Sequence, residues 1–114
     1  MTDPWFPDRV AEILDVVGAR FGIGRAQLLA KGRSKTIAMA RTIAIRLCRD
    51  EGYSFPELGR FFVRDESTIR SACLAAATRI VGDKDPDFAR EFFACVRTLQ
   101  RGGVLRVRIK ETAA

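Results

Sequence analysis

The sequence predicts an all-α domain, a bundle of about six helices that contains a helix-turn-helix. Three observations predict it. A chain of 114 residues suits one domain of ordinary size. Apolar residues recur at helical spacing along most of the chain. Between residues 54 and 78, two capped helix starts stand one short turn apart, so the two helices must cross at a steep angle.

The first two helices follow an N-terminal arm, residues 1–7, which Pro4 and Pro7 keep irregular. We expect Trp5 and Phe6 of this arm to dock on the core. The apolar face of the first helix consists of Val10, Ile13, Leu14, Val17 and Phe21. Gly22 can supply a left-handed stop, and residues 25–30 then form a short second helix.

A basic segment without a single acidic residue extends from Lys31 to Arg49. Its first part, residues 31–35, contains a glycine and no helical apolar pattern, which predicts an exposed basic loop. A central third helix follows, with an apolar face of Ile37, Ala40, Ile43, Ala44, Leu47 and Cys48. Basic residues on a helix usually form a solvated face, but the absence of acids favours a surface that faces phosphates.

The helix-turn-helix begins at Ser54, and Glu57 stands three residues later, as a capping box requires. Asp65-Glu66-Ser67-Thr68 begins the second helix of the pair, with Asp65 as its cap. This geometry offers the N-terminal end of the second helix to the major groove of DNA. Gly59, inside the first helix, costs about 1 kcal/mol relative to alanine, so we expect another backbone to approach it closely.

The last helix begins at Asp85-Pro86, a cap followed by a first-turn proline, and ends before Gly102. Its apolar face consists of Phe88, Phe92, Cys95, Val96 and Leu99. The basic tail, residues 102–114, alternates apolar and basic residues without a partner strand. Three alternatives are open for it: it is flexible, it pairs with a second copy, or it lies along DNA. We expect residues 1–114 to form a single domain.

The composition favours some classes of function and excludes others. A formal net charge of +6 favours a polyanionic partner such as nucleic acid or an acidic membrane surface. The chain has no histidine, and its three cysteines, Cys48, Cys73 and Cys95, stand too far apart in sequence for a metal clip. We therefore expect no enzyme, no metal and no nucleotide cofactor. Neither a signal peptide nor a membrane-spanning apolar run is present in the sequence, which predicts a cytoplasmic protein.

Three segments, in this order, resemble the C-terminal DNA-binding domain of the bacterial replication initiator DnaA. Residues 40–44, ARTIA, resemble the family's A/P-R-Q-I/M-A, and residues 54–59, SFPELG, resemble S-L-P-E-I-G. Residues 64–69, RDESTI, occupy the place of R-D-H-T-T-V. The resemblance covers about residues 10–100 and implies a Trp-repressor-like helix-turn-helix with a basic loop before the central helix. It also implies binding of double-stranded DNA, at a DnaA-box-like or variant site, for replication or transcription regulation on the nucleoid.

The resemblance implies a role for each matching position. It places Arg33 in the minor groove, with Lys31 and Lys35 on flanking phosphates. It places Asp65, Glu66 and Ser67 at base edges in the major groove, with Pro56 close to a thymine methyl. It assigns phosphate contacts to Arg41, Arg49 and Thr68. Arginine suits a narrow, electronegative minor groove, and a helix N-terminus favours nearby phosphates.

The sequence departs from the family in four ways. Glu66 stands where the family has a histidine, and an acid can accept from cytosine but cannot donate to guanine. Val63 stands where the family commonly has two glycines, and Gly32 replaces a basic residue. The ATPase module that precedes this domain in the initiator is absent from the 114 residues, so we expect a stand-alone DNA-binding protein.

Glu66 and the shortened turn favour an alternative: a protein-interaction module that kept the fold and lost specific DNA reading. A protein partner or a second copy would then dock on Trp5, Phe6 or the basic tail. The basic segment opposes this alternative.

Overall fold

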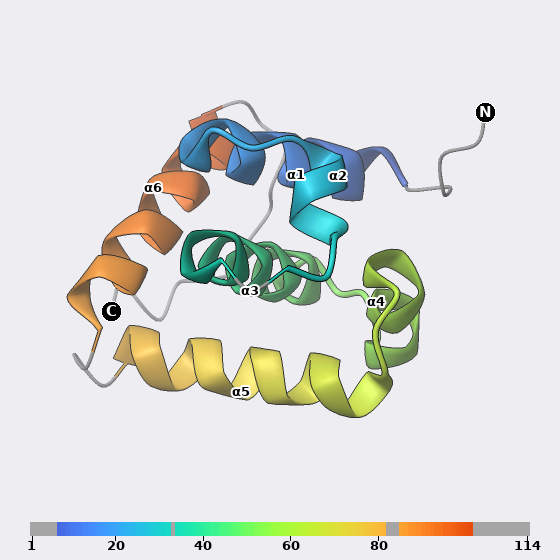
Figure 1. Cartoon of the computed structure of the whole chain (residues 1–114). Helices are drawn as coiled ribbons and strands as arrows, with labels where there is room; N and C mark the ends of the chain where they lie inside the picture. The colour runs from blue at the N-terminus through green and yellow to red at the C-terminus, as the bar shows by residue number, and fades with distance from the viewer. Residues whose placement is uncertain (1–6, 33, 82–84, 102–114) are drawn as a thin grey trace.

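The computed structural model describes residues 7–32, 34–81 and 85–101, which form six α-helices and no strand (Figure 1). The helices are α1 (Asp8–Phe21), α2 (Arg25–Leu29), α3 (Lys35–Asp50), α4 (Phe55–Phe62), α5 (Glu66–Val81) and α6 (Pro86–Arg101). The prediction of an all-α bundle of about six helices is confirmed. The predictions for Trp5, Phe6, Arg33 and the basic tail fall outside the described residues.

Helix α3 is the centre of the bundle and contacts each of the other five helices. In Figure 1, α1 and α2 lie above it, α4 and α6 lie at its two sides, and α5 runs along the lower edge of the molecule. Its buried residues are Ala40, Ile43, Ala44, Ile45, Leu47 and Cys48. Three phenylalanines, Phe62, Phe88 and Phe92, are the largest of the fully buried side chains around it. One helix therefore holds α2, α4 and α5, the elements of the predicted site, on a common core.

Several predicted caps are confirmed. Ser54 Oγ accepts from the Glu57 N–H at 3.2 Å, and a Glu57 oxygen accepts from the Ser54 N–H at 2.8 Å. These hydrogen bonds hold the pKa of the Glu57 carboxyl below its usual value. Asp85 Oδ1 accepts from the Phe88 N–H at 3.1 Å, and Gly22 ends α1 in the left-handed region, at φ 72°. Each cap is set by a few neighbouring residues, which is why the sequence alone predicts it.

The start of α3 corrects one predicted boundary. Lys35, expected in the basic loop, is the first residue of the helix. The reason is Ser34, whose Oγ accepts from the Ile37 N–H at 3.2 Å and so caps the helix. The connection between α2 and α3 therefore ends one residue earlier than expected, at Ser34, and Lys35 occupies the first turn of a helix.

Helices α4 and α5 cross at a short turn, as the helix-turn-helix prediction requires. Val63 ends α4 at φ 55° and ψ 54°, the left-handed region. The Arg64 N–H then donates to the Gly59 carbonyl at 3.0 Å. A Cβ placed on Gly59 would lie 2.9 Å from the Arg64 carbonyl oxygen. The predicted close approach at Gly59 is confirmed, and the approaching backbone is that of the turn itself.

We predict that Gly59→Ala destabilises the domain. At an open helix position this substitution stabilises a protein by about 0.5–1 kcal/mol. Here the added methyl group must displace the turn, and overpacking of this kind typically costs about 1–3 kcal/mol. Urea unfolding measures the free energy of unfolding, with Gly32→Ala as the control because a Cβ there meets nothing within 4 Å. Equal urea midpoints for Gly59→Ala and the native chain would show that the turn accommodates the methyl group without loss of stability.

Candidate nucleic-acid interface

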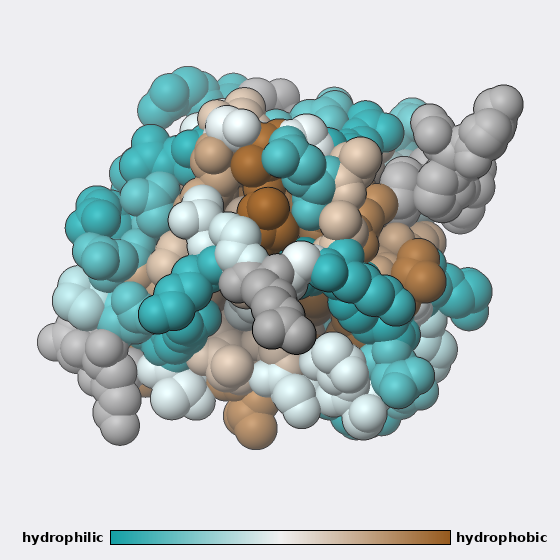
Figure 2. All heavy atoms as spheres, in the orientation of Figure 1, coloured by the Kyte–Doolittle hydropathy of each residue, from teal (hydrophilic) through white to brown (hydrophobic). Residues whose placement is uncertain are grey.

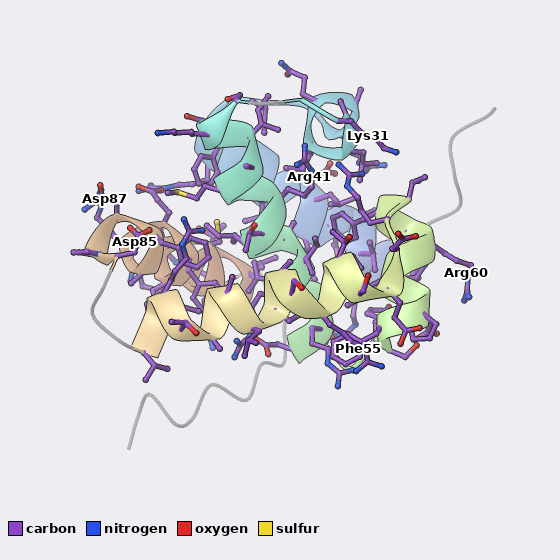
Figure 3. The ribbon with its side chains drawn as sticks, turned by 60° about the horizontal axis from the view of Figure 1, so that its bottom comes forward. Lys31, Arg41, Phe55, Arg60, Asp85 and Asp87 are labelled. Carbon is purple, nitrogen blue, oxygen red and sulfur yellow. The ribbon has the colours of Figure 1, made fainter. Side chains whose placement is uncertain are left out.

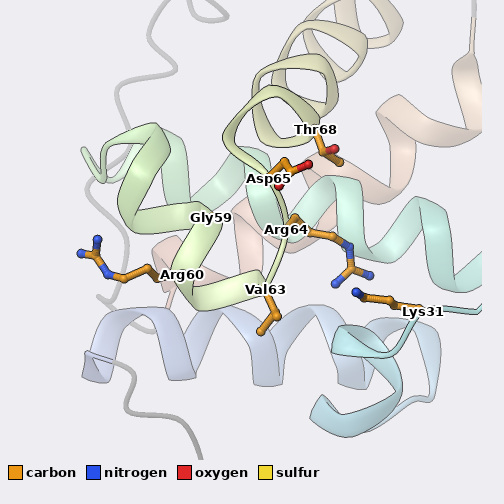
Figure 4. A pocket seen from close by; sticks show the side chains of 7 residues that line it. All are labelled: Lys31, Gly59, Arg60, Val63, Arg64, Asp65 and Thr68. Carbon is orange, nitrogen blue, oxygen red and sulfur yellow. The ribbon is translucent and has the colours of Figure 1, made fainter.

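The α2–α3 loop and the helix-turn-helix share one surface depression. It is open to solvent, has a volume of about 780 Å³, and lies where the loop meets the turn between α4 and α5 (Figure 4). Its lining residues are Lys31, Gly59, Arg60, Val63, Arg64, Asp65 and Thr68. Three of these residues carry a positive charge and one carries a negative charge. The depression therefore offers a net positive, partly polar surface between two elements that are far apart in sequence.

Two arginines attach the loop to the rest of the domain. Arg64, in the turn before α5, donates to the carbonyls of Leu29 and Ala30 at 3.3 and 3.1 Å, and also to the Phe62 carbonyl at 2.6 Å. Arg41, on α3, donates to the Leu28 carbonyl at 2.8 Å and also to the Ala30 carbonyl. We call this set of hydrogen bonds the arginine clamp. It satisfies the carbonyls that end α2 and fixes the backbone immediately before Lys31.

The clamp gives Arg41 a structural task that sequence reasoning missed. Its guanidinium is half-buried, and burial, followed by the nearby charge of Arg64, lowers the pKa of Arg41 below its usual value. Figure 3 shows Arg41 beside the segment that carries Lys31. The phosphate contact assigned to Arg41 remains a prediction. The hydrogen bonds show that at least two of its donors serve the α2–α3 connection.

The other predicted contacts among the described residues lie on the surface: Lys31 in the loop, Arg49 in the last turn of α3, and the rest at or beside the first turns of α3, α4 and α5. Asp65 directly precedes α5, and its carbonyl accepts from the Ile69 N–H at 3.1 Å. The exposed residues among the predicted contacts are Lys31, Lys35, Arg49, Pro56, Asp65, Glu66, Ser67 and Thr68. Thus the helix-turn-helix presents the N-terminal end of α5 to solvent, next to the loop, in the arrangement that the motif predicts.

A second cluster lies beside the first turn of α5 and was missed by sequence reasoning. The guanidinium carbons of Arg49 and Arg70 lie 4.2 and 4.4 Å from the centre of the Phe55 ring. Arg70 also donates to Glu66 Oε2 at 2.6 Å. The Arg49 guanidinium is fixed further by a 2.9 Å hydrogen bond to the Tyr53 carbonyl. The four-residue spacing of Glu66 and Arg70 was the available signal for the ion pair.

Comparison with known proteins identifies the domain. A family model described as "Bacterial dnaA protein helix-turn-helix" matches residues 10–75, more than half of the chain. This chain belongs to the bacterial DnaA helix-turn-helix family. The matched segment includes the loop, the arginine clamp and the first turns of α4 and α5.

Relatives of this DnaA-family domain are named as chromosomal replication initiator proteins. That of Deinococcus radiodurans is 35% identical over 92 residues, which is 80% of this chain and 18% of the relative. That of Acinetobacter baumannii is 34% identical over 93 residues, with 80% and 20% of the two chains covered. The Wolinella succinogenes protein is 38% identical over 73 residues, or 62% of this chain and 17% of that protein. The chain thus spans about a fifth of the length of these initiators.

The cysteines of this DnaA-family domain lie in or near the core and away from the depression. Cys48 and Cys95 are buried, and Cys73 is half-buried. Burial raises the pKa of Cys95 to about 11 and raises that of Cys48 further. Within the described ranges, no three acidic, cysteine or histidine side chains gather as a metal site would require, and none of the helices could cross a membrane.

Val63 is the strained residue of the DnaA-family turn. It is 60% exposed and has a positive φ, which is an outlier for a β-branched residue. The left-handed conformation costs a non-glycine residue about 1–2 kcal/mol. A glycine at this position would avoid that cost, so Val63 leaves backbone strain in the turn.

We predict that Val63→Gly stabilises the domain by about 0.5–1 kcal/mol, because the relief of strain exceeds the added flexibility of the unfolded chain. Urea unfolding tests this value. Val63→Ala is the matched control, since it removes most of the exposed side chain and keeps the Cβ. A gain in Val63→Ala equal to that in Val63→Gly would assign the effect to the exposed side chain instead of the backbone.

Proposed function

We propose that this domain binds double-stranded DNA in a sequence-specific manner and acts as a replication or transcription regulator. The basic loop enters the minor groove, and the N-terminal end of α5 enters the adjacent major groove. The sugar-phosphate backbone between the two grooves crosses the depression. The observation that carries the proposal is that Lys31 of the loop and Asp65 and Thr68 at the start of α5 line one depression.

The electrostatics of the depression suit a phosphodiester. Lys31, Arg60 and Arg64 supply positive charge, against the single carboxylate of Asp65. The Thr68 hydroxyl is exposed in the first turn of α5, where the unpaired N–H groups and the helix dipole also favour a phosphate. Since backbone contacts position a protein on the duplex, the depression would set the register in which the loop and α5 meet the bases.

The outer face of α5 suits close approach to base pairs. The lower edge of the molecule, which α5 forms, is coloured mostly pale, for residues of intermediate hydropathy (Figure 2). Its exposed residues include the small side chains of Ser67, Ser71 and Ala75, spaced four residues apart. Small side chains on one face let a helix backbone enter the major groove deeply enough for its longer neighbours to reach base edges.

Because of Glu66, we expect the preferred DNA site to be a variant of the DnaA box. A carboxylate at a base edge accepts from cytosine N4, whereas the family's histidine can donate to a base. In this proposal the domain therefore reads a sequence related to, but different from, the DnaA box. A Glu66→His variant would move the preference toward the family's site.

A second candidate is a protein-interaction module that has kept the fold. Leu74 and Val81, on α5, are 70% and 82% exposed, so this helix presents apolar surface. The positive depression favours DNA over this candidate, because a purely protein-binding domain has no need for three cations around the start of α5.

We predict that log affinity for duplex DNA falls with log salt at a slope of about −4 to −5, the value for about five neutralised phosphates. Fluorescence anisotropy across a salt series measures it. Lys31→Ala should weaken binding similarly on every duplex and reduce the size of the slope by about 1. Arg97→Ala, an equal charge change at an exposed position on α6, is the matched control and should leave the slope unchanged. A flat salt response of the native chain would favour the protein-interaction candidate.

A further inference from the structure

The geometry around Phe55 points to Arg70 as a specificity-determining DNA contact. We propose that Arg70 reads a guanine in the major groove and that Phe55 and Glu66 hold its guanidinium in place for this contact. The inference rests on the proposed function, since it concerns the same face of α5. It adds a base-reading residue beyond the positions at which DNA contacts were predicted.

Arg70 is exposed, and two neighbouring side chains contact its guanidinium. Its side chain is 58% exposed, and its guanidinium carbon lies 4.4 Å from the centre of the Phe55 ring. The same guanidinium donates to Glu66 Oε2 at 2.6 Å. A stacked and hydrogen-bonded guanidinium has little rotamer freedom left to lose when it binds. It still has donors that are not used by Glu66, because arginine carries five.

The face of α5 on which Arg70 lies follows from the helical spacing. Arg70 stands one turn after Glu66 on α5, so both residues project from the same face. Ser67 and Ser71, two of the exposed neighbours of Arg70, are small. Arg70 is therefore the long cationic side chain on the part of α5 that would enter the major groove. Figure 3 shows its stacking partner, Phe55, beside the N-terminal half of α5.

The pairing with Glu66 favours a base over a phosphate. A carboxylate close to a phosphate is repelled, whereas it can accept from cytosine N4 at a base edge. Arg70 neutralises the Glu66 charge in the free domain at 2.6 Å. Together the two side chains offer a guanidinium fork for guanine O6 and N7 and an acceptor for a neighbouring cytosine. Glu66, at the N-terminal end of α5, thus forms with Arg70 a pair of side chains that contact neighbouring bases.

The test measures sequence preference in variants. A preferred duplex is first selected with the native chain from a random pool, and affinities are then measured for all single base-pair changes. Arg70→Ala should lose roughly five- to 150-fold affinity for the preferred duplex and lose discrimination at one G·C pair. Arg70→Lys should keep the salt slope and still lose that discrimination, because lysine lacks the planar fork.

Arg79→Ala is the matched control. Arg79 lies near the other end of α5, stacks on Phe88 at 4.8 Å and pairs with Asp85 at 3.3 Å. Its loss removes an equivalent stack and ion pair, and the base preference should remain that of the native chain. Circular dichroism checks that each variant is folded.

The outcomes separate the two proposals. Uniform weakening of Arg70→Ala on all duplexes, with a reduced salt slope, would make Arg70 a phosphate contact and overturn the inference. Unchanged affinity and preference would overturn it as well. In both cases salt-dependent binding by the native chain would still support the proposed function. If the native chain does not bind duplex DNA, the proposed function fails, and the inference about Arg70 fails with it.

Discussion

Hydrogen bonds from Arg41 and Arg64 to the carbonyls that end α2 hold together the two parts of the candidate interface. A helix end leaves carbonyls unsatisfied, and a short helix such as α2 has little stability of its own. The clamp uses guanidinium groups from α3 and from the turn before α5, so the same bonds that satisfy α2 also determine where Lys31 lies. In Figure 4, Lys31 and Arg64 point toward one another across the depression. The loop is thereby positioned by the helix-turn-helix.

The turn between α4 and α5 imposes a second constraint, because it is short and tightly packed. Gly59 leaves room for the Arg64 carbonyl. Val63 adopts a left-handed conformation, and this one residue reverses the chain between the end of α4 and Arg64. Both features place Arg64 where its side chain reaches the carbonyls of Leu29 and Ala30. Strain at such a position persists only when the surroundings fix the backbone, and it is common near functional sites. The strained turn and the clamp are thus parts of one arrangement.

The sequence predicts those features that a few neighbouring residues determine. The Ser54–Glu57 capping box, the stop at Gly22 and the close approach at Gly59 all follow from local patterns. The clamp could not be predicted in this way, because Arg64 bonds to a carbonyl 34 residues away and such pairs depend on the tertiary fold. The left-handed Val63 was also missed, since β-branched residues rarely adopt that conformation. The Ser34 cap had a readable signal, a serine immediately before the apolar pattern of α3.

The most direct test of this account is a DNA footprint of Arg64→Met at saturating protein, on the duplex selected with the native chain. Methionine keeps an apolar stem and removes the two hydrogen bonds that Arg64 donates to the Leu29 and Ala30 carbonyls, while the Arg41 half of the clamp is left in place. If the clamp positions the loop, minor-groove protection from hydroxyl radicals should be lost while protection of guanine N7 in the major groove remains. Persistence of both protections would show that the loop is placed without the clamp. Equal loss of both would show that Arg64 supports binding as a whole, and either result would contradict the account.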